Sequence, residues 1–385
     1  MKTLLATSAL AMLAAGSVFA GGIDRSGQSV SVIFEEGDYM EFSFGSVDPT
    51  VSGVQTFATP FGPAGDGSPS GDMAPSYTRL GMGYKQQLND NLSFGLIWDQ
   101  PFGADVAYPG PQANPPYYAA GSTATLSSNA LTAVVKYTTD SNFSVYGGAR
   151  FQNMSAEAMI PFVESYTANA DQDSGTGWLV GAAWEKPEIA LRVALTYNSE
   201  INHTFATSES CVSTVAESAL ACAADFSSTF TDVTTPESIN LEFQSGIAAD
   251  TLVFGSIRWV NWSDFHISPT LYGLLTEGGS LVSYDNDTVS YSIGVGRRFS
   301  DTLSGAISYG YEAAAGGFAS NLGPTDGYNS ITAGLTYTMD NVSITGGVSY
   351  VMIGDAQTTL NDVLASGVFE GNSALGFGIK VGMSF

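Results

Sequence analysis

The chain has 385 residues and combines abundant glycine (44 residues) and 12% aromatic residues with only 13% charged residues. Its 37 acidic residues outnumber the 12 Lys and Arg, and the net charge of −25 makes nucleic acid and anionic membrane surfaces unfavourable partners. After the first twenty residues, no apolar run approaches the roughly 18 residues of a membrane helix, so a membrane crossing would have to use strands.

Residues 1–20 have the pattern of a secretory signal peptide. Lys2 precedes an apolar stretch from Leu4 to Ala15, and this stretch is too short to span a bilayer. The small residue Ala20 follows a few positions later. We therefore expect cleavage after Ala20 and export of the mature chain to the outer membrane of a Gram-negative bacterium.

Residues 21–38 come next and carry charged side chains, among them Arg25 and Glu35, that are too polar to face lipid. We expect this segment to form an N-terminal hatch that folds back into the lumen of a barrel. Its charges are expected to meet lumen cations such as Arg79 and Arg150.

Fourteen segments of alternating polarity run from Tyr39 to Phe385. In the last of them, Leu375, Phe377 and Ile379 alternate with glycine and Lys380. Because successive side chains of a strand point to opposite faces, the pattern predicts one face toward lipid and one toward a polar lumen. The sequence thus predicts an all-β fold, a transmembrane antiparallel β-barrel of about fourteen strands over residues 39–385. The expected strands are 39–46, 78–87, 91–100, 128–138, 143–151, 176–185, 189–198, 237–247, 251–262, 287–299, 302–311, 329–339, 342–352 and 373–385.

The connections between these segments alternate between very short and very long. Short turns at one end and long loops at the other are typical of outer-membrane barrels. The expected turns are Asn89-Asp90-Asn91, Asp140-Ser141-Asn142, Lys186-Pro187-Glu188, Ala249-Asp250, Ser300-Asp301 and Asp340-Asn341. The seven long connections, expected to be extracellular loops, are 47–77, 101–127, 152–175, 199–236, 264–286, 312–328 and 354–372.

Most basic residues of the expected strands fall on the lumen face. They can pair with lumen acids such as Glu41, Asp99 and Glu242, or they can contact a transported solute, and the sequence leaves both roles open. The candidate ligand-binding residues of the lumen and hatch are Phe34, Arg79, Arg150, Arg192 and Arg258.

One expected strand, 91–100, is poorly suited to a regular ladder. Pro101 lacks an N–H group, and Gly95 and Gly103 bracket it. We expect a bend there that opens a lateral exit, with Asp99 facing the lumen; alternatively, Pro101 merely ends the strand. The residues of this exit strand are Gly95, Asp99, Pro101, Phe102 and Gly103.

The two cysteines, Cys211 and Cys222, lie in one long loop, and an exported protein favours a disulfide between them. A thiol nucleophile or a metal pair is the alternative. No metal site and no cofactor are expected.

Catalytic motifs are missing from the chain. The two histidines, His203 and His266, fall in different expected loops. A surface hydrolase that uses His266 with Ser263 or Ser268 would lack a positioned third group, so the chain is not expected to be an enzyme.

Three segments together resemble the long-chain fatty-acid transporter (FadL/TodX-type) family of outer-membrane proteins. The first is 92–108, with Pro101-Phe102-Gly103 and the later Tyr108. The second is the hairpin 177–203, which ends in Tyr197-Asn-Ser-Glu-Ile-Asn-His203. The third is Thr235-Pro-Glu-Ser-Ile-Asn-Leu241, followed by Arg258-Trp-Val-Asn-Trp-Ser-Asp-Phe265.

This resemblance implies a fourteen-stranded barrel that captures hydrophobic molecules at loops 152–175 and 199–236 and releases them laterally near residues 95–103. Long-chain fatty acids are the first expected ligands and aromatic hydrocarbons the second. Outer-membrane lipid and lipopolysaccharide are expected to surround a monomer. The alternatives are a diffusion porin for small polar solutes and a structural or adhesive surface barrel.

Overall fold

The computed structural model describes residues 23–56, 67–111, 113, 116–360 and 364–385. The expected signal peptide and its cleavage site lie outside the described residues. Within the described part, no helix is long and apolar enough to cross a membrane.

Seventeen antiparallel strands of the described chain form one closed sheet, because β1 pairs with β3 on one side and β22 on the other. In three places, two strands lie end to end and occupy one position in the barrel wall: β4 with β5, β9 with β10, and β11 with β12. A strand position in the wall is named here a stave, and the seventeen strands therefore make fourteen staves, as expected. Its strands are β1 (Tyr39–Thr50), β3 (Tyr77–Gln87), β4 (Leu92–Asp99), β5 (Gly103–Ala107), β6 (Thr123–Thr138), β7 (Phe143–Ile160), β8 (Tyr166–Lys186), β9 (Leu191–Asn198), β10 (Ile201–Ser210), β11 (Thr229–Thr235), β12 (Ser238–Ala248), β13 (Thr251–Val260), β16 (Thr288–Arg298), β17 (Leu303–Glu312), β18 (Tyr328–Met339), β19 (Val342–Ile353) and β22 (Ser373–Ser384).

The remaining elements lie in residues 23–38, for which the name hatch is kept as a label, and in the connections. The strands β2 (Gly53–Gln55), β20 (Ala356–Thr359) and β21 (Ala365–Phe369) form a small sheet, and β14 (His266–Ile267) pairs with β15 (Val282–Ser283). The helices are α2 (Ala216–Cys222) and α3 (Thr270–Leu275), with the 3-10 turns η1 (Ser31–Phe34), η2 (Pro187–Ile189) and η3 (Trp262–Asp264).

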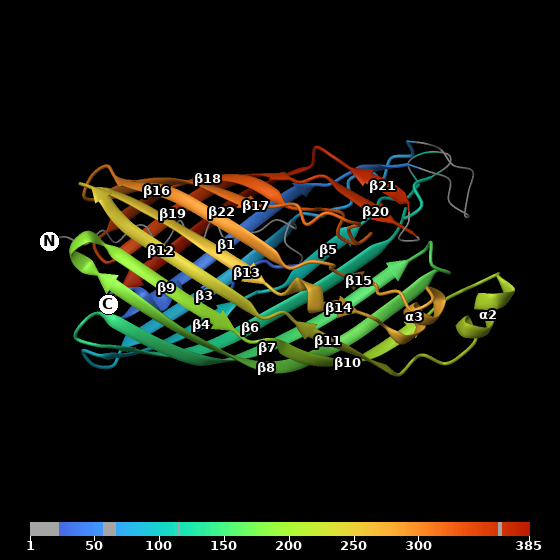
Figure 1. Cartoon of the computed structure of the whole chain (residues 1–385), viewed down its shortest axis with the longest axis horizontal. Coiled ribbons are helices and arrows are strands. Elements are labelled where there is room, and N and C mark those ends of the chain that lie inside the picture. The colour runs from blue at the N-terminus through green and yellow to red at the C-terminus, as the bar shows by residue number, and fades with distance from the viewer. Residues whose placement is uncertain (1–22, 57–66, 112, 114–115, 361–363) are drawn as a thin grey trace.

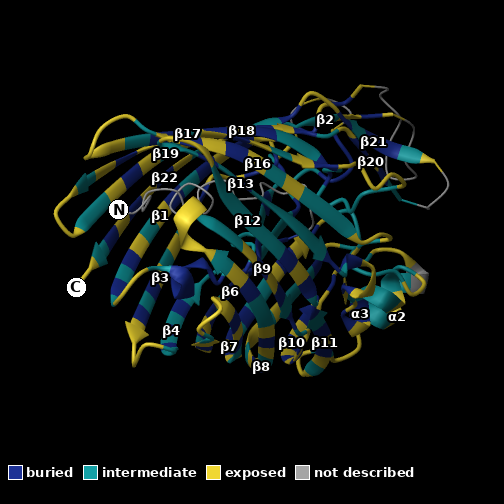
Figure 2. Cartoon of the chain, turned by 60° about the vertical axis from the view of Figure 1, so that its left-hand side comes forward, coloured by how far each residue is buried: buried dark blue, intermediate teal, exposed yellow. Residues whose placement is uncertain are grey.

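The strands show the alternation that the sequence predicts. On β22, Phe377 and Ile379 are each 53% exposed, whereas Lys380, the residue after Ile379, is 3% exposed. Buried and exposed residues follow one another along the strands of Figure 2. The outer face is therefore apolar and suited to lipid, and the polar side chains point into the barrel.

The two ends of the barrel differ (Figure 1). All six expected short turns lie at one end, named here the turn end, together with the C-terminus. Asp250 and Asp340 adopt positive φ in two of these turns, as tight hairpins require. The long connections, α2, α3, β20 and β21 lie at the other end, named here the loop end.

Three expected loops are wrong in extent. Loop 101–127 contains β5 and the first five residues of β6. Loop 152–175 is mostly strand, because β7 and β8 continue to a connection of residues 161–165, and loop 199–236 contains β10 and β11. The outward side chains here include Glu157, Asn169 and Asp171, which are exposed. Because these strand extensions carry polar residues outside, they lack the apolar alternation that identified the other strands.

Candidate functional site

The stave made of β4 and β5 is interrupted at residues 100–102, named here the wall break. Asp99 pairs with Ala130 of β6, and Gly103 pairs with Ser127. This stave thus advances four residues while β6 advances three, and the extra residue forms a bulge. The bulge reverses which face the side chains occupy, so Ala104 and Val106 of β5 point into the lumen.

The wall on the other side of the break is also discontinuous. The ladder between β3 and β4 ends at Met82 and Trp98, and no ladder joins Tyr77–Gly81 to β5 in the described residues. The Gln100 side chain substitutes for a backbone partner, since its Oε1 accepts from the Leu80 N–H at 2.9 Å.

The hatch supplies the backbone partners that the wall lacks. The Arg25 N–H donates to the Pro101 carbonyl at 2.8 Å, and the Gly103 N–H donates to the Ile23 carbonyl at 2.9 Å. Asp24 and Phe102 therefore form an antiparallel bridge. From β6, the Ser128 hydroxyl accepts from the Phe102 N–H at 2.8 Å and donates to the Phe102 carbonyl at 2.6 Å.

Charged side chains hold this part of the hatch. The Arg258 guanidinium pairs with the Asp24 carboxylate at 2.7 Å and also donates to Gln28 of the hatch at 3.2 Å. Arg25 pairs with Asp105 at 2.6 Å and lies over the Tyr77 ring, 4.2 Å from its centroid. Ser26 donates to Asp99 at 2.5 Å.

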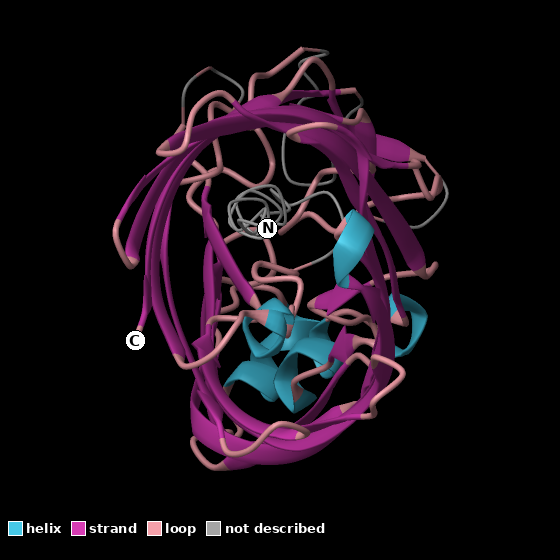
Figure 3. Ribbon diagram, turned by 90° about the vertical axis from the view of Figure 1, so that its left-hand side faces the viewer, coloured by secondary structure: helices cyan, strands magenta, loops and turns pink. Residues whose placement is uncertain are grey.

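The second half of the hatch is apolar and packs in the lumen toward the turn end, in one buried cluster with residues of the wall such as Ile97 and Tyr146. Figure 3 looks into the ring of strands from this end. Phe34 packs edge-on against Tyr146, with ring centroids 5.6 Å apart. Lys136 and Arg192 lie over the Phe34 ring at 4.7 and 4.8 Å. Phe34 is therefore a hatch anchor, and two lumen cations contact it.

The predicted partners of the lumen arginines are partly wrong. Arg79 donates to the Arg25 backbone carbonyl rather than to a hatch carboxylate. Arg150 is buried and donates to Thr132 at 2.9 Å on the neighbouring strand. Charge pairing between the hatch and the wall uses Asp24 and Arg25, whose partners Arg258 and Asp105 lie on β13 and β5.

The discontinuity in the predicted exit strand also lies later in the chain than expected. Gly95 lies in a regular ladder between Lys85 and Val134, so it does not contribute to the bend. A Cβ at Gly95 would lie 2.8 Å from Ile33 Cγ2, and one at Gly103 would lie 2.6 Å from Arg25 Cζ. Both glycines make room for the hatch, while the discontinuity itself consists of residues 100–102.

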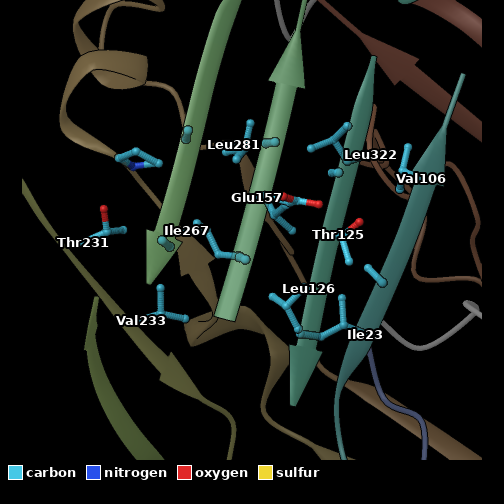
Figure 4. Close-up of a pocket in the computed structure, with 18 of the residues that line it drawn as sticks. Ile23, Val106, Thr125, Leu126, Glu157, Thr231, Val233, Ile267, Leu281 and Leu322 are labelled. Atoms are coloured by element: carbon cyan, nitrogen blue, oxygen red, sulfur yellow. The ribbon is translucent and has the colours of Figure 1, made fainter. Parts of the chain in front are cut away.

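An apolar cavity, partly open to its surroundings, lies on the loop-end side of the break (Figure 4). Ile23, Leu126, Phe205 and Val233 contribute to its wall, from the hatch and from three different staves. Among its described lining residues none is basic, and the charged one is Glu157, whose side chain is largely exposed. Desolvation raises the pKa of Tyr284, so this phenol stays neutral beside the cavity.

Two further cavities adjoin the same region. The mouth cavity shares Ile23, Tyr284 and Leu322 with the apolar cavity and is bordered by the connections after β13, β17 and β19. The wall cavity lies at the break and is lined by Ser26 and Asp99 on the lumen side and by the outward residues Leu80, Met82 and Trp98.

The remaining candidates do not form a second site. Cys211 and Cys222 are joined by a disulfide next to α2. His203 lies in β10 rather than in a loop, and its Nδ1 is 3.1 Å from Asp173 Oδ2. The Ser263 hydroxyl donates to Asp287 at 2.7 Å, while the ring Nδ1 of His266 lies 3.2 Å from the Asp264 carbonyl. This geometry gives no serine–histidine pair.

Several residues of the site had no signal in the sequence. Asp24, Asp105 and Ser128 come together only through the fold of the hatch onto the wall. Trp262 is fully buried against Phe102. Its segment, 258–265, contributed to the family resemblance, but no sequence pattern assigned Trp262 to the site.

Comparison with curated protein sequences gives no match. Solved structures share the fold at low identity. A Pseudomonas aeruginosa FadL homologue is 14% identical with a TM-score of 0.72, and covers 97% of this chain and 98% of its own. The toluene transporter TodX of Pseudomonas putida is 13% identical with a TM-score of 0.64, over 97% and 98% of the two chains. The toluene transporter TbuX of Ralstonia pickettii is 12% identical with a TM-score of 0.60, over 92% and 91%.

The family model of outer-membrane transport proteins (OMPP1/FadL/TodX) matches residues 40–385, nearly the whole described barrel. This match agrees with the closed fourteen-stave barrel, its apolar outer face and the segment folded into its lumen. The chain therefore belongs to the OMPP1/FadL/TodX family of outer-membrane transport proteins, which are transporters and not enzymes.

Proposed function

We propose that the protein carries uncharged hydrophobic molecules across the outer membrane, with small aromatic hydrocarbons ahead of the long-chain fatty acids that the resemblance implied. The observation that carries this proposal is the apolar cavity beside the wall break. A fatty-acid carboxylate would lose its hydration there and would find no basic partner among the described lining residues. An aromatic hydrocarbon has no such cost.

The proposed path begins at the mouth cavity. A ligand would pass from there into the apolar cavity, because the two share part of their lining. The connections around the mouth follow β13, β17 and β19, rather than the expected capture loops 152–175 and 199–236. Lipopolysaccharide and outer-membrane lipid are proposed to surround a monomeric barrel.

The proposed exit is the wall break. A backbone group left unpaired in hydrocarbon costs several kcal/mol, and Ile23 and Arg25 of the hatch satisfy such groups at Pro101 and Gly103. A ligand that leaves laterally has to displace this part of the hatch. Because the hatch also occupies the lumen, this arrangement favours a transporter over the alternative of an open diffusion porin.

Matched ligands test the proposal. We expect purified protein to bind toluene and methyl oleate and to bind oleate more weakly, because only oleate carries the charge. Oleate binding more tightly than its methyl ester would contradict the proposal. Ion conductance in planar bilayers separates the alternatives, because an open porin would give stable channels and the closed transporter would be nearly silent.

A pair of variants on one strand tests the cavity. Ala158→Phe on β7 fills the cavity, and we expect about a tenfold loss of toluene binding. Ala149→Phe adds the same volume to the exposed outer face of β7 and should leave binding unchanged. Equal binding by the two variants would show that ligands bind elsewhere.

A further inference from the structure

Four aromatic residues, Phe102, Trp262, Phe265 and Tyr284, form a cluster between the apolar cavity and the wall break. Trp262 lies at the centre of this aromatic cluster. Its ring centroid lies 6.0 Å from that of Phe102, 5.5 Å from that of Phe265 and 5.2 Å from that of Tyr284. Trp262 is 0% exposed.

Hydrogen bonds fix the segment that brings Trp262 into the barrel. After β13 ends at Val260, the Asn261 N–H donates to the Glu237 carbonyl at 3.1 Å. The Phe265 N–H then donates to the Trp262 carbonyl at 2.9 Å and closes η3. The position of the indole is thus set by the barrel rather than by a free loop.

The indole N–H of Trp262 is a buried donor with no acceptor among the described residues. Trp259, three residues earlier, provides the contrast, because its indole N–H donates to Asp287 at 3.1 Å. Buried polar groups are nearly always hydrogen-bonded in folded proteins, so an unpaired buried donor calls for an explanation.

The cluster adjoins the ligand path that is proposed above. Tyr284 lines both the apolar and the mouth cavity, and Ile23 and Leu126 of the cavity wall pack in the same core as Trp262. On the other side, Phe102 belongs to the wall break itself. The Trp262 indole thus contacts one residue that lines the cavity, Tyr284, and one residue of the break, Phe102, and it lies beside the proposed path between them.

We propose that Trp262 is a specificity-determining residue whose indole N–H donates a hydrogen bond to the acceptor of an aromatic ligand on its way to the break. The site would then prefer aromatic molecules with one acceptor, such as an aryl ketone, over hydrocarbons of the same size. The rings of the cluster pack on the aromatic part, and the N–H satisfies the one polar atom. This inference rests on the proposed function, in which uncharged hydrophobic molecules occupy the apolar cavity.

Acetophenone and ethylbenzene form a matched test pair, because they have the same size and differ in the carbonyl oxygen. Calorimetry on the detergent-solubilised full chain would compare their affinities for the wild type, Trp262→Phe and Trp259→Phe. We expect Trp262→Phe to lower the acetophenone preference about fivefold, the effect of one hydrogen bond. Trp259→Phe, the control with a paired indole, should keep the wild-type preference.

The outcomes separate the two proposals. An unchanged preference in Trp262→Phe, with ethylbenzene still bound, would overturn the role of Trp262 alone. Failure of the wild type to bind ethylbenzene would contradict the proposed function. A second measurement needs no folded variant: among the five tryptophan indole N–H signals in a nuclear magnetic resonance spectrum, one buried signal should shift with acetophenone and not with ethylbenzene. Absence of that shift would also overturn the proposal.

Discussion

Two pairs of neighbouring strands in the same barrel are built differently. β18 and β19 pair over all twelve residues, from Tyr328 with Ile353 to Met339 with Val342. β3 and β4 pair over only six, and the ladder stops at Met82 and Trp98. In the regular pair, the backbone N–H and carbonyl groups find their partners within the sheet. At the break, part of these backbone partners comes from the hatch.

The side chains facing the lumen differ in the same way. Between β18 and β19, hydroxyl groups bond one another across the strands, with Thr336 and Thr345 2.8 Å apart. On β3 and β4, Gly83 and Gly95 instead leave space for Val32 and Ile33 of the hatch. Any change to the hatch should therefore affect the break and spare the regular pair.

Among the changes that distinguish the break from the regular strand pair, removal of the hatch should have the largest effect. In a variant lacking residues 23–36, the turn end of the lumen loses its filling and the break loses its backbone partners. We expect stable ion-conducting channels in planar bilayers, where the wild type is nearly silent. Conductance that stays at the wild-type level would show that the segment does not close the lumen.

Arg258→Met should release the first part of the hatch. It leaves the Asp24 carboxylate, which is 5% exposed, without its ion-pair partner, at a cost of about 3–5 kcal/mol. Hydrogen exchange should then become fast at residues 23–28 and stay slow in β18 and β19. Arg297→Met, at an exposed position of β16, is the control. Adding Asp24→Asn to Arg258→Met should restore part of the protection, since it removes the buried charge that Arg258 had compensated.

Gly95→Ala compares the two strand pairs by the stability cost of one added methyl group. Its Cβ would lie 2.8 Å from the buried Ile33, and we expect a loss of about 1–3 kcal/mol. Gly346→Ala on β19 meets no atom within 4 Å, so its effect should stay within about 0.5 kcal/mol. The temperature at which each variant unfolds in SDS gives the comparison, and equal values would contradict the fit between hatch and wall.

Gln100→Ala should have the smallest effect. It removes the side-chain acceptor of the Leu80 N–H beside the break and should cost about 1 kcal/mol. Gln100→Glu keeps an acceptor oxygen and should preserve most of the stability. The same unfolding assay would detect the difference, and a Gln100→Ala value equal to the wild type would mean that water already satisfies this N–H.

The sequence predicted the barrel well because lipid imposes a strict alternation on each strand. Leu375, Phe377 and Ile379 could point only one way, and short turns such as Asp340-Asn341 marked the hairpins. The same reasoning missed β10 and β11, whose outward residues are mostly polar, with Phe230 and Ala206 as exceptions. Where lipid does not select the outer face, alternation carries no signal.

The site was predictable only in part, for a related reason. Pro101 marked the right strand, because a missing N–H disturbs any ladder. Gly95 looked like part of the bend, but its role depends on Ile33, a contact between residues 62 positions apart that no local pattern encodes. The partners Asp24 and Arg258 likewise become visible only in the folded barrel.

The central claim is that ligands leave through the break between β4 and β5, and deletion of Pro101 tests it most directly. The deletion removes the extra residue opposite β6 and lets the two strands join in one regular ladder. Pro101→Ala keeps the extra residue and serves as the matched control. We predict that the deletion variant, at normal abundance and with a folded barrel, loses toluene uptake while Pro101→Ala retains most of it. Normal uptake by the deletion variant would contradict an exit through this wall.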